Sequence, residues 1–483
     1  AGTLTLLDIL RTGRNWTYAT GSLAPGTSSV VFTGSGGGVI TGDHALANVE
    51  IRGGTITIAA GTTLTVAGMT TLTDGNLNGG TLEALADISL LGTFDGETAT
   101  ILIAGTGDQT LTGTATATTG DAPNVTIDKP SGTLFLVGTI RLTTAAWTWL
   151  SGAVDPGTSL LVLDTGTTIS GTHTLNDVLL RGGAHTIGGG MPTAAGTLTL
   201  EDGTINGGTF GAAGDVDQLP TFDGGSGALE INGVTDQTFT GTATLALGDL
   251  PNVVIDKSGG TLFLVGTLRM SGASWTHVGG TVDAGSSLLV VVGTSSLAAA
   301  GMTFNNLTVN GGTTTLTQDL NVGGDLVVAA GTLNGAGMTI VVAGDVTIDG
   351  AFTPGTGLLV MNGVVPQVLG GAAANIGLYD YTVNNAPGVT ITTDVSVAGT
   401  LTLNGPLDIS GQTLGIANPI AGTPTNLTGD PLSSLVVSGT GAGIVIPSTL
   451  PVLANLTLDN PNGAALAGPL TIGSLLTLTD GVL

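Results

Sequence analysis

The side chains best suited to chemistry in this chain are its carboxylates. Asp and Glu total 34 of 483 residues, and enzymes that cleave polysaccharides place two carboxylates at the glycosidic bond as acid and base. Asp95 recurs as Asp223, and Asp128 recurs as Asp256, each 128 residues further on and beside an expected turn. An active site is needed once, so this recurrence favours a structural role in turns. We therefore assign no catalytic residue.

Four histidines could bind a metal ion: His44, His173, His185 and His277. His44 and His173 occupy equivalent positions just before expected strands, but the next equivalent position holds Met302, which does not replace a histidine ligand. We interpret them as polar turn residues and assign neither a metal site nor a cofactor. Ca²⁺ at acidic turns stays open as an alternative to solvated carboxylates, although Gly323-Gly-Asp325 is isolated and not a tandem calcium repeat.

Three Trp-Thr-x pieces place two rings two residues apart, which is one face of a strand. They begin at Trp16, Trp147 and Trp275. Facing outward, the rings would form a platform for sugars or for a partner subunit. Facing inward, they would fill the widest part of a core, and the Leu401-Thr-Leu403 segment in the next block favours this second interpretation.

These residues recur because the chain repeats itself. Gly132-Thr-Leu-Phe-Leu-Val-Gly-Thr139 returns unchanged as residues 260–267, an offset of 128 residues. A fixed period must be settled before any other interpretation, since repeat arrays are easily mistaken for globular domains. We expect one continuous structure over residues 1–483, built from blocks at about 11–140, 141–268 and 269–398, with a partial, shorter-period block at 399–483.

Within each block lie pieces of strand length. From Leu307 to Gly331, Thr or Asn alternates with Val, Leu or Ile, and Gly or Asp punctuates the pieces. This alternation predicts half-buried strands, and closely spaced short strands indicate an all-β solenoid, sandwich or barrel. Aromatic residues make up only 3% of the chain, too few for a string of immunoglobulin-like sandwiches. We therefore predict an all-β fold, a parallel β-helix (β-solenoid) with three strands in each turn of about 20–22 residues.

Charge and composition exclude several partners. The net charge is −26, and all eight basic residues lie at or before Arg269. Nucleic acids and anionic membranes both require clustered Lys and Arg, so neither is expected as a partner. There is no Cys, and no apolar run reaches the roughly 18 residues of a membrane span. Because the chain starts without Met and stops in mid-pattern at Leu483, we expect it to be part of a longer mature protein.

The last repeat carries a resemblance to known proteins. Residues 456–481, LTLDNPNGAALAGPLTIGSLLTLTDG, resemble the Gly/Thr/Asn-rich strand repeats of large bacterial surface proteins, including haemagglutinin-like and autotransporter-type adhesins. This resemblance implies secretion, a right-handed parallel β-helix stalk, and a role in adhesion, biofilm matrix or a cell-surface fibre. It brings no catalytic residues with it.

From these observations we expect an extracellular structural or adhesive protein at the cell surface, not an enzyme, that associates with itself in a filament or array and could also contact surface glycans. The alternatives are a polysaccharide-acting β-helix enzyme and a carbohydrate-binding module. One cleft with several carboxylates and an Arg in a single block would favour the enzyme. Aromatic residues projecting outward on successive blocks would favour the binding module.

Asn-x-Thr sequons, the acceptor sites for N-glycosylation, begin at Asn15, Asn124, Asn306, Asn426 and Asn455.

Overall fold

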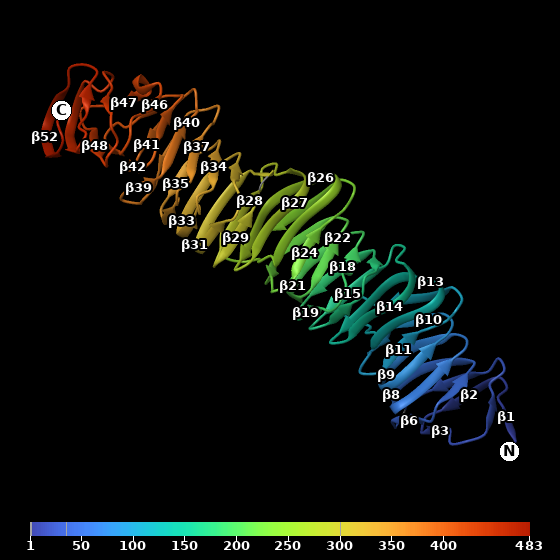
Figure 1. Ribbon diagram of the computed structural model, residues 1–483. Helices are drawn as coiled ribbons and strands as arrows, with labels where there is room; N and C mark the ends of the chain where they lie inside the picture. Colours follow the sequence, from blue (N-terminus) through green and yellow to red (C-terminus); the bar gives the residue numbers. More distant parts are fainter. Residues whose placement is uncertain (1, 35, 300) are drawn as a thin grey trace. The chain divides into compact units, whose positions relative to one another are not determined.

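The strands stack as a parallel β-solenoid. The computed structural model describes residues 2–34, 36–299 and 301–483, and strands make up 62% of the chain (Figure 1). There are about 24 turns of about 20 residues each, so the predicted fold class is confirmed. Within the described residues the one helical element is the 3-10 turn η1 (Pro424–Asn426), and no helix there is long and apolar enough to cross a bilayer.

The chain forms two compact units. The first comprises residues 1–239 and 257–260, and the second comprises residues 240–256 and 261–483. Strand β26 (Asn252–Ser271) contributes residues to both. The block limits predicted above describe the repetition of the sequence and stay a prediction.

The long strands of the first unit are β8 (Asn48–Val66), β9 (Thr70–Ala84), β13 (Asn124–Thr143), β14 (Ala146–Asp155) and β21 (Leu198–Gly207). Its shorter strands are β1 (Thr3–Thr5), β2 (Ile9–Thr12), β3 (Trp16–Thr17), β4 (Ser22–Ala24), β5 (Ser29–Phe32), β6 (Gly38–Thr41), β7 (His44–Leu46), β10 (Ile88–Phe94), β11 (Thr100–Ile103), β12 (Gln109–Thr114), β15 (Leu160–Asp164), β16 (Thr168–Ser170), β17 (Thr174–Leu175), β18 (Asp177–Arg181), β19 (Ala184–Ile187), β20 (Thr193–Ala194), β22 (Thr209–Ala212), β23 (Val216–Phe222) and β24 (Ala228–Ile231), with β25 (Gln237–Thr242) at its end.

A long strand in this fold bends and serves more than one face. The start of β13 pairs with β11, its middle pairs with β12, and its end pairs with β15, always in parallel. The bends fall at Gly132 and Gly138, whose φ angles are 72° and 75°. A Cβ atom at either position would lie within 2.4 Å of a carbonyl oxygen of the previous turn. The repeated phrase therefore begins and ends its apolar run with glycine because the corner admits no other residue.

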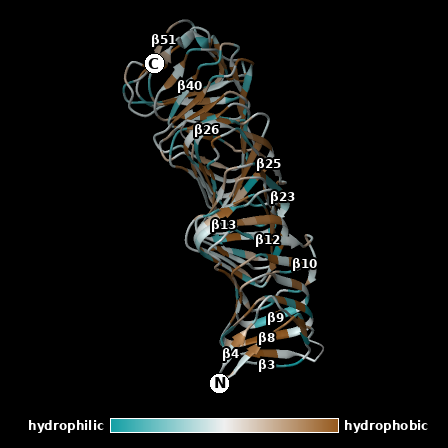
Figure 2. Ribbon diagram, turned by 90° about the vertical axis from the view of Figure 1, so that its right-hand side faces the viewer, coloured by the Kyte–Doolittle hydropathy of each residue, from teal (hydrophilic) through white to brown (hydrophobic). Residues whose placement is uncertain are grey.

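The core is built from alternate residues of each strand. Along β13, Val125, Ile127, Leu134 and Leu136 are buried, whereas Thr126 and Phe135, which alternate with them, face outward, as the period of two requires. Figure 2 shows this alternation as brown segments separated by paler ones along the strands. Full burial of one such side chain contributes about 1.5–3 kcal/mol, so the stacked aliphatic columns supply most of the stability.

The second unit shows three parallel faces clearly. One face is the sheet β30 (Thr303–Phe304), β32 (Leu320–Val322), β34 (Thr339–Val342), β37 (Leu358–Met361), β40 (Asp380–Val383), β43 (Leu401–Leu403) and β46 (Ala421–Gly422). Another is β39 (Ile376–Leu378), β42 (Val395–Val397), β45 (Thr413–Ile416), β48 (Ser434–Ser438), β50 (Val452–Asp459) and β52 (Thr471–Asp480). The third contains β31 (Asn306–Leu316), β33 (Leu326–Asn334), β35 (Val346–Ile348), β38 (Gln367–Gly370), β41 (Val389–Ile391), β44 (Leu407–Asp408) and β47 (Leu427–Thr428). The remaining strands are β27 (Ser274–Asp283), β28 (Leu288–Val292), β29 (Ser295–Ala298), β36 (Ala351–Thr353), β49 (Val445–Ile446) and β51 (Ala465–Leu466).

Candidate functional site

Most turn carboxylates bind the backbone of the chain itself. In a repeated contact that we call a turn clamp, the Oδ1 atom of an Asp or Asn accepts the N–H of a residue one turn further along, at 2.6–3.2 Å. Turn clamps with Asp involve Asp43, Asp87, Asp108, Asp177, Asp215, Asp319, Asp325, Asp345, Asp349, Asp380 and Asp394. The clamp satisfies an N–H at a corner where no strand partner is available. These eleven carboxylates therefore have a structural role.

The four recurring carboxylates occupy equivalent exposed positions in pairs. Asp95 and Asp223 donate their backbone N–H to Gly75 and Gly203 of the previous turn. Asp128 accepts the hydroxyl of Ser151 at 2.7 Å. The Asp128 contact fits the structural role expected for recurring Asp residues, whereas the Asp95 and Asp223 contacts involve the backbone alone.

A turn clamp can be tested at Asp177, which accepts the N–H of Thr197 at 2.7 Å. The variant Asp177→Ala leaves that N–H without its acceptor, and we expect it to lower the free energy of unfolding by about 1–2 kcal/mol. Asp177→Asn keeps an acceptor oxygen and is expected to cost less than about 0.5 kcal/mol, because Asn252 makes the same contact to Ser274 elsewhere. Urea unfolding of the two variants measures the difference, and equal losses would contradict the clamp.

The strongest candidate for a chemical site is a carboxylate–arginine cluster. The Arg141 guanidinium is buried and binds Asp121, and it also binds the Asp164 carboxylate at 2.6 Å. Two carboxylates, from Asp121 and Asp164, therefore contact one arginine. The Arg141–Asp121 pair recurs in the next block, where Arg269 is buried against Asp249, but Val292 stands at the position equivalent to Asp164. Because the Arg–Asp pair recurs with the block, we interpret this pair as part of the fold.

Arg141 binds Asp121, the last residue of a loop. We call residues Thr116–Asp121 and their repeat Thr244–Asp249 the straps, since side chains of later turns bind each of them. Arg181 donates to the Ala117 carbonyl at the tip of the first strap at 2.8 Å. Val162 and Val290 are completely buried, although each lies between two other buried residues and so points to the opposite side of its strand. The arginines thus attach a loop to the solenoid surface.

Both lysines of the chain are buried. The Lys129 ammonium donates to the carbonyls of Gly105 and Gly107 at 2.8 and 2.9 Å, and to Gln109 Oε1 at 2.7 Å. Burial lowers the pKa of Lys129, and the nearby Asp108 charge opposes this shift. Lys257 repeats the arrangement with Gly233, Thr235 and Gln237.

The third copy of this arrangement replaces the charge with an amide. Asn385 Nδ2 takes the place of the lysine ammonium: it donates to Gln367 Oε1 at 2.8 Å and also to the Val365 carbonyl. Sequence reasoning missed this site, although the recurrence of Asp108-Gln-Thr110 at residues 236–238 was a visible signal. In all three copies the glutamine Oε1 accepts from a buried side-chain nitrogen, twice from a lysine and once from an asparagine. The position therefore requires a buried donor and not a particular charge.

The tryptophans pair with the histidines. Trp147 is fully buried, and its Nε1 donates to His173 Nε2 at 2.9 Å; Trp16 donates to His44 at 2.8 Å. In the next copy Trp275 is fully buried beside Met302, with its Nε1 3.4 Å from the sulfur. The core interpretation of Trp147 and Trp275 is therefore confirmed. His44 and His173 act as acceptors for indole N–H groups.

His173 makes stability depend on pH. Burial lowers the pKa of His173 to about 4, so between the ordinary pKa near 6.5 and this value the unfolded chain takes up a proton that the folded chain does not. Stability is unaffected above about pH 7, and we expect it to fall by about 3 kcal/mol as the pH drops from about 6.5 to 4. The variant His173→Met introduces the residue type found at the equivalent position 302. In unfolding measurements across pH, this variant should not show the fall of about 3 kcal/mol that the His173 titration causes. An identical pH profile for the variant and the parent would contradict the assignment.

Three of the sequon asparagines use their amide nitrogen inside the fold. Asn124 Nδ2 donates to the carbonyls of Thr98 and Ala99, Asn426 Nδ2 donates to the Leu403 carbonyl, and Asn455 Nδ2 donates to Ser434 Oγ. A glycan attached to one of these nitrogens would break the contact between two turns. Structure therefore accounts for these asparagines without glycosylation.

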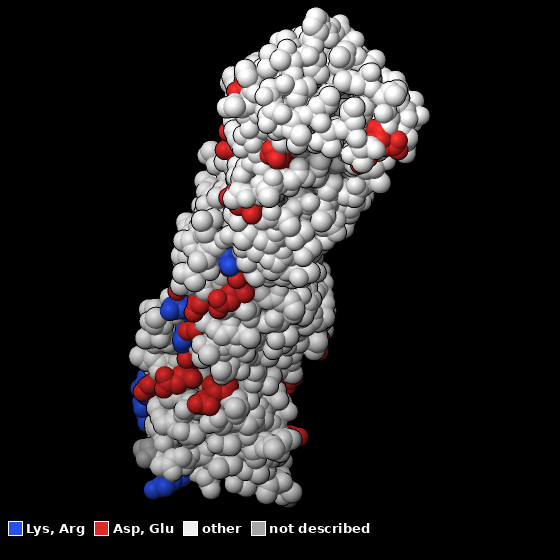
Figure 3. Space-filling model, turned by 90° about the vertical axis from the view of Figure 1, so that its left-hand side faces the viewer, with Lys and Arg blue, Asp and Glu red and all other residues white. Residues whose placement is uncertain are grey.

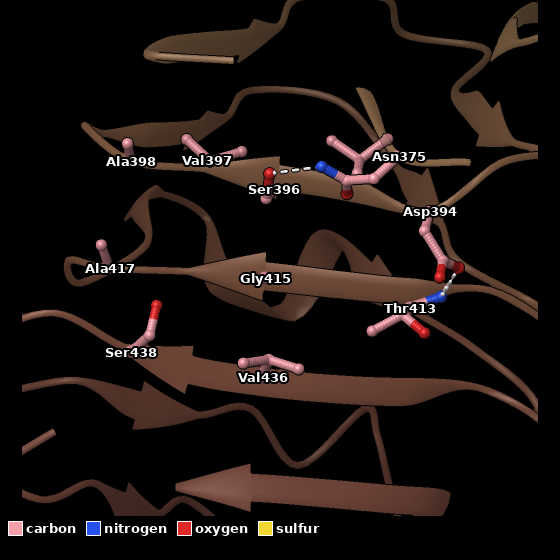
Figure 4. Close-up of a pocket in the computed structure, with 11 residues that line it drawn as sticks. Asn375, Asp394, Ser396, Val397, Ala398, Thr413, Gly415, Ala417, Val436 and Ser438 are labelled. Atoms are coloured by element: carbon pink, nitrogen blue, oxygen red, sulfur yellow. Dashed lines mark hydrogen bonds between the residues drawn. The ribbon is translucent and has the colours of Figure 1, made fainter. Parts of the chain in front are cut away.

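The outer surface contains shallow hollows. One of about 280 Å³ lies across β42, β45 and β48, where Gly415 lies between Ser396 and Val436 (Figure 4). At one side of it, Asp394 clamps the N–H of Thr413, and Asn375 donates to Ser396 Oγ at 2.9 Å. Hollows of about 310 and 370 Å³ lie beside Asn48 and Asn252, which also form turn clamps. Such hollows accompany the turns repeatedly, so this one does not identify a unique site.

Neither metal geometry nor comparison with other proteins singles out a site. Across residues 2–34, 36–299 and 301–483, no three His, Cys, Asp or Glu side chains are grouped so that they could hold one metal ion. The chain matches no protein-family model, no curated protein and no solved structure.

Proposed function

We propose that this chain is an extracellular structural and adhesive β-solenoid that forms part of a cell-surface fibre, filament or matrix. The observation that carries the proposal is the use of polar side chains: turn clamps, buried lysines and arginine clusters bind neighbouring turns and recur from block to block. An array stabilised in this way can extend by adding turns, because each turn contacts only its neighbours.

Self-association is the second part of the proposal. Large areas of the face shown in Figure 3 carry neither acidic nor basic side chains. Small uncharged side chains lose little rotamer entropy on burial, so such surfaces pack closely at small cost. The net charge of −26 opposes lateral packing at low salt, and we propose that salt or divalent cations at acidic turns relieve this repulsion.

The rival enzyme class can be tested directly. Purified chain is incubated with neutral and acidic polysaccharides, and new reducing ends or unsaturated products are measured over time. We expect no turnover above the background of a heat-denatured sample. Turnover that disappears in the Arg141→Ala or Asp121→Ala variant would contradict the proposal and would favour a polysaccharide-acting enzyme.

The location can be tested separately. Intact source cells are treated with a protease that cannot enter them, and released peptides are identified. We expect peptides of this chain among those released, and none from a cytoplasmic marker. Recovery of the chain only after lysis would contradict an extracellular role.

A further inference from the structure

Two aromatic residues project from the solenoid at repeated positions. Phe135 and Phe263 lie on the outward side of β13 and β26, and their exposed fractions are 36% and 37%. Val137 and Val265, two residues further along, face the same way and are 47% and 46% exposed. We call Phe135 with Val137, and Phe263 with Val265, the outward pairs. Each outward pair lies within one of the two compact units.

The outward pairs are retained where other outward residues change. Both belong to the phrase that returns unchanged after 128 residues. The buried leucines of that phrase are explained by core packing, but an outward side chain has no such constraint. Outward positions nearby differ between the blocks: Thr126 and Val254, Leu150 and Val278. Retention of a half-exposed Phe and Val therefore indicates a contact made outside the fold.

Each ring has a carboxylate beside it. The strand register places Asp155 next to Phe135 and Asp283 next to Phe263, on the adjacent turn. Asp283 Oδ1 accepts the Gly285 N–H at 2.9 Å, which fixes the carboxylate beside the ring. A carboxylate offers about four acceptor positions, so this bond leaves capacity for hydroxyl donors.

A hollow with further polar groups begins at the same carboxylate. Asp283, Gly285, Thr303 and Asn305 line a surface hollow of about 310 Å³. Asn305 donates to the Ser287 carbonyl at 3.2 Å, which orients its amide. The preceding block, residues 141–268, has the same residue types at the equivalent positions, Asp155, Gly157, Thr174 and Asn176. There the Asn176 amide donates to the Ser159 carbonyl, and the Gly157 N–H donates to Asp155 Oδ1.

We propose that each outward pair, with its neighbouring Asp, Thr and Asn, binds a neutral oligosaccharide, so that the chain carries two equivalent glycan sites. The apolar face of a pyranose ring covers the Phe ring, and its hydroxyls bind the carboxylate, hydroxyl and amide groups alongside. Acidic sugars would be repelled by the carboxylate.

The size of the apolar surface favours a sugar over a protein. A third of a Phe side chain exposes roughly 70 Å², and the neighbouring Val adds a similar area. A stable protein interface buries roughly 800 Å² on each partner. One or two sugar rings match the smaller area. The inference goes beyond the proposed structural role, because it assigns a ligand and holds equally for an isolated chain.

Binding is tested by calorimetric titration of the full chain. The probes are neutral linear hexasaccharides of glucose, mannose, xylose and N-acetylglucosamine, with hexagalacturonic acid as the acidic comparison. We expect at least one neutral probe to bind with two sites per chain. Phe135→Thr or Phe263→Thr should leave one site, and the double variant should weaken binding at least about tenfold. Thr suits an outward strand position, so the fold should persist.

The matched control is the double variant Leu150→Thr with Val278→Thr, which removes two equally apolar outward side chains that are 57% and 62% exposed. This control should bind like the parent. A second measurement needs no variant: with fluorine-labelled Phe, two of the nine Phe signals should shift on adding the bound sugar.

Three outcomes would overturn the assignment: no neutral probe binds, the Phe135→Thr/Phe263→Thr double variant binds like the parent, or hexagalacturonic acid binds best. Filament formation is measured independently by electron microscopy, so failure of the glycan sites and failure of the structural role can be told apart.

Discussion

Replacing Lys129 with Ala is expected to lower the free energy of unfolding by about 3–5 kcal/mol. Lys129 is 2% exposed, and its ammonium group donates to three oxygens on the previous turn. Its removal leaves these buried acceptors without a donor and opens a cavity. Urea unfolding followed by circular dichroism measures the loss, and hydrogen exchange at residues 104–109 should show faster local opening.

Arg52→Ala is the control for this prediction, since that side chain is half exposed and paired with Glu50. An exposed pair contributes at most about 1 kcal/mol, so we expect a small effect. If Lys129→Ala cost no more than Arg52→Ala, the buried lysine would not be a determinant of the fold.

Replacing Trp147 with Ala is expected to cost about 3–5 kcal/mol. The side chain is completely buried, and its loss removes apolar contacts and the N–H that His173 accepts at 2.9 Å. Trp147→Phe retains most of the volume but leaves His173 Nε2 without its donor, so an intermediate loss of about 1–3 kcal/mol is expected. Thermal and urea unfolding of both variants provide the comparison.

The control is Leu150→Ala in the same strand, whose side chain is 57% exposed. A surface substitution of this kind stays within about 0.5 kcal/mol. Equal losses for Trp147→Ala and Leu150→Ala would contradict the inward orientation of the indole ring.

Much of the fold could be predicted because local physics decides it. Alternation of apolar and polar residues indicates strands, and Gly132 and Gly138 mark corners where a side chain would collide with the previous turn. The recurrence of Asp95 and Asp128 in the next block indicated structural turns. Each of these signals is contained within a short stretch of sequence or within the period itself.

The partners of buried polar groups could not be predicted in the same way. Lys129 and Gln109 are 20 residues apart, and Trp147 and His173 are 26 residues apart. Which residues meet depends on the exact length of each turn, and the turns vary by several residues. The outward direction of Phe135 depends similarly on where the corner at Gly132 resets the alternation. Composition and the repeat period do not determine which residues of the strand face outward after the corner.

The central claim is that the chain is a structural element that assembles with copies of itself. Electron microscopy of native material, prepared with and without a calcium chelator and at low and high salt, tests this claim most directly. We predict filaments or lateral arrays whose packing loosens at low salt or with chelator. Isolated single chains at every salt and calcium concentration would contradict the assembly and leave a solitary stalk.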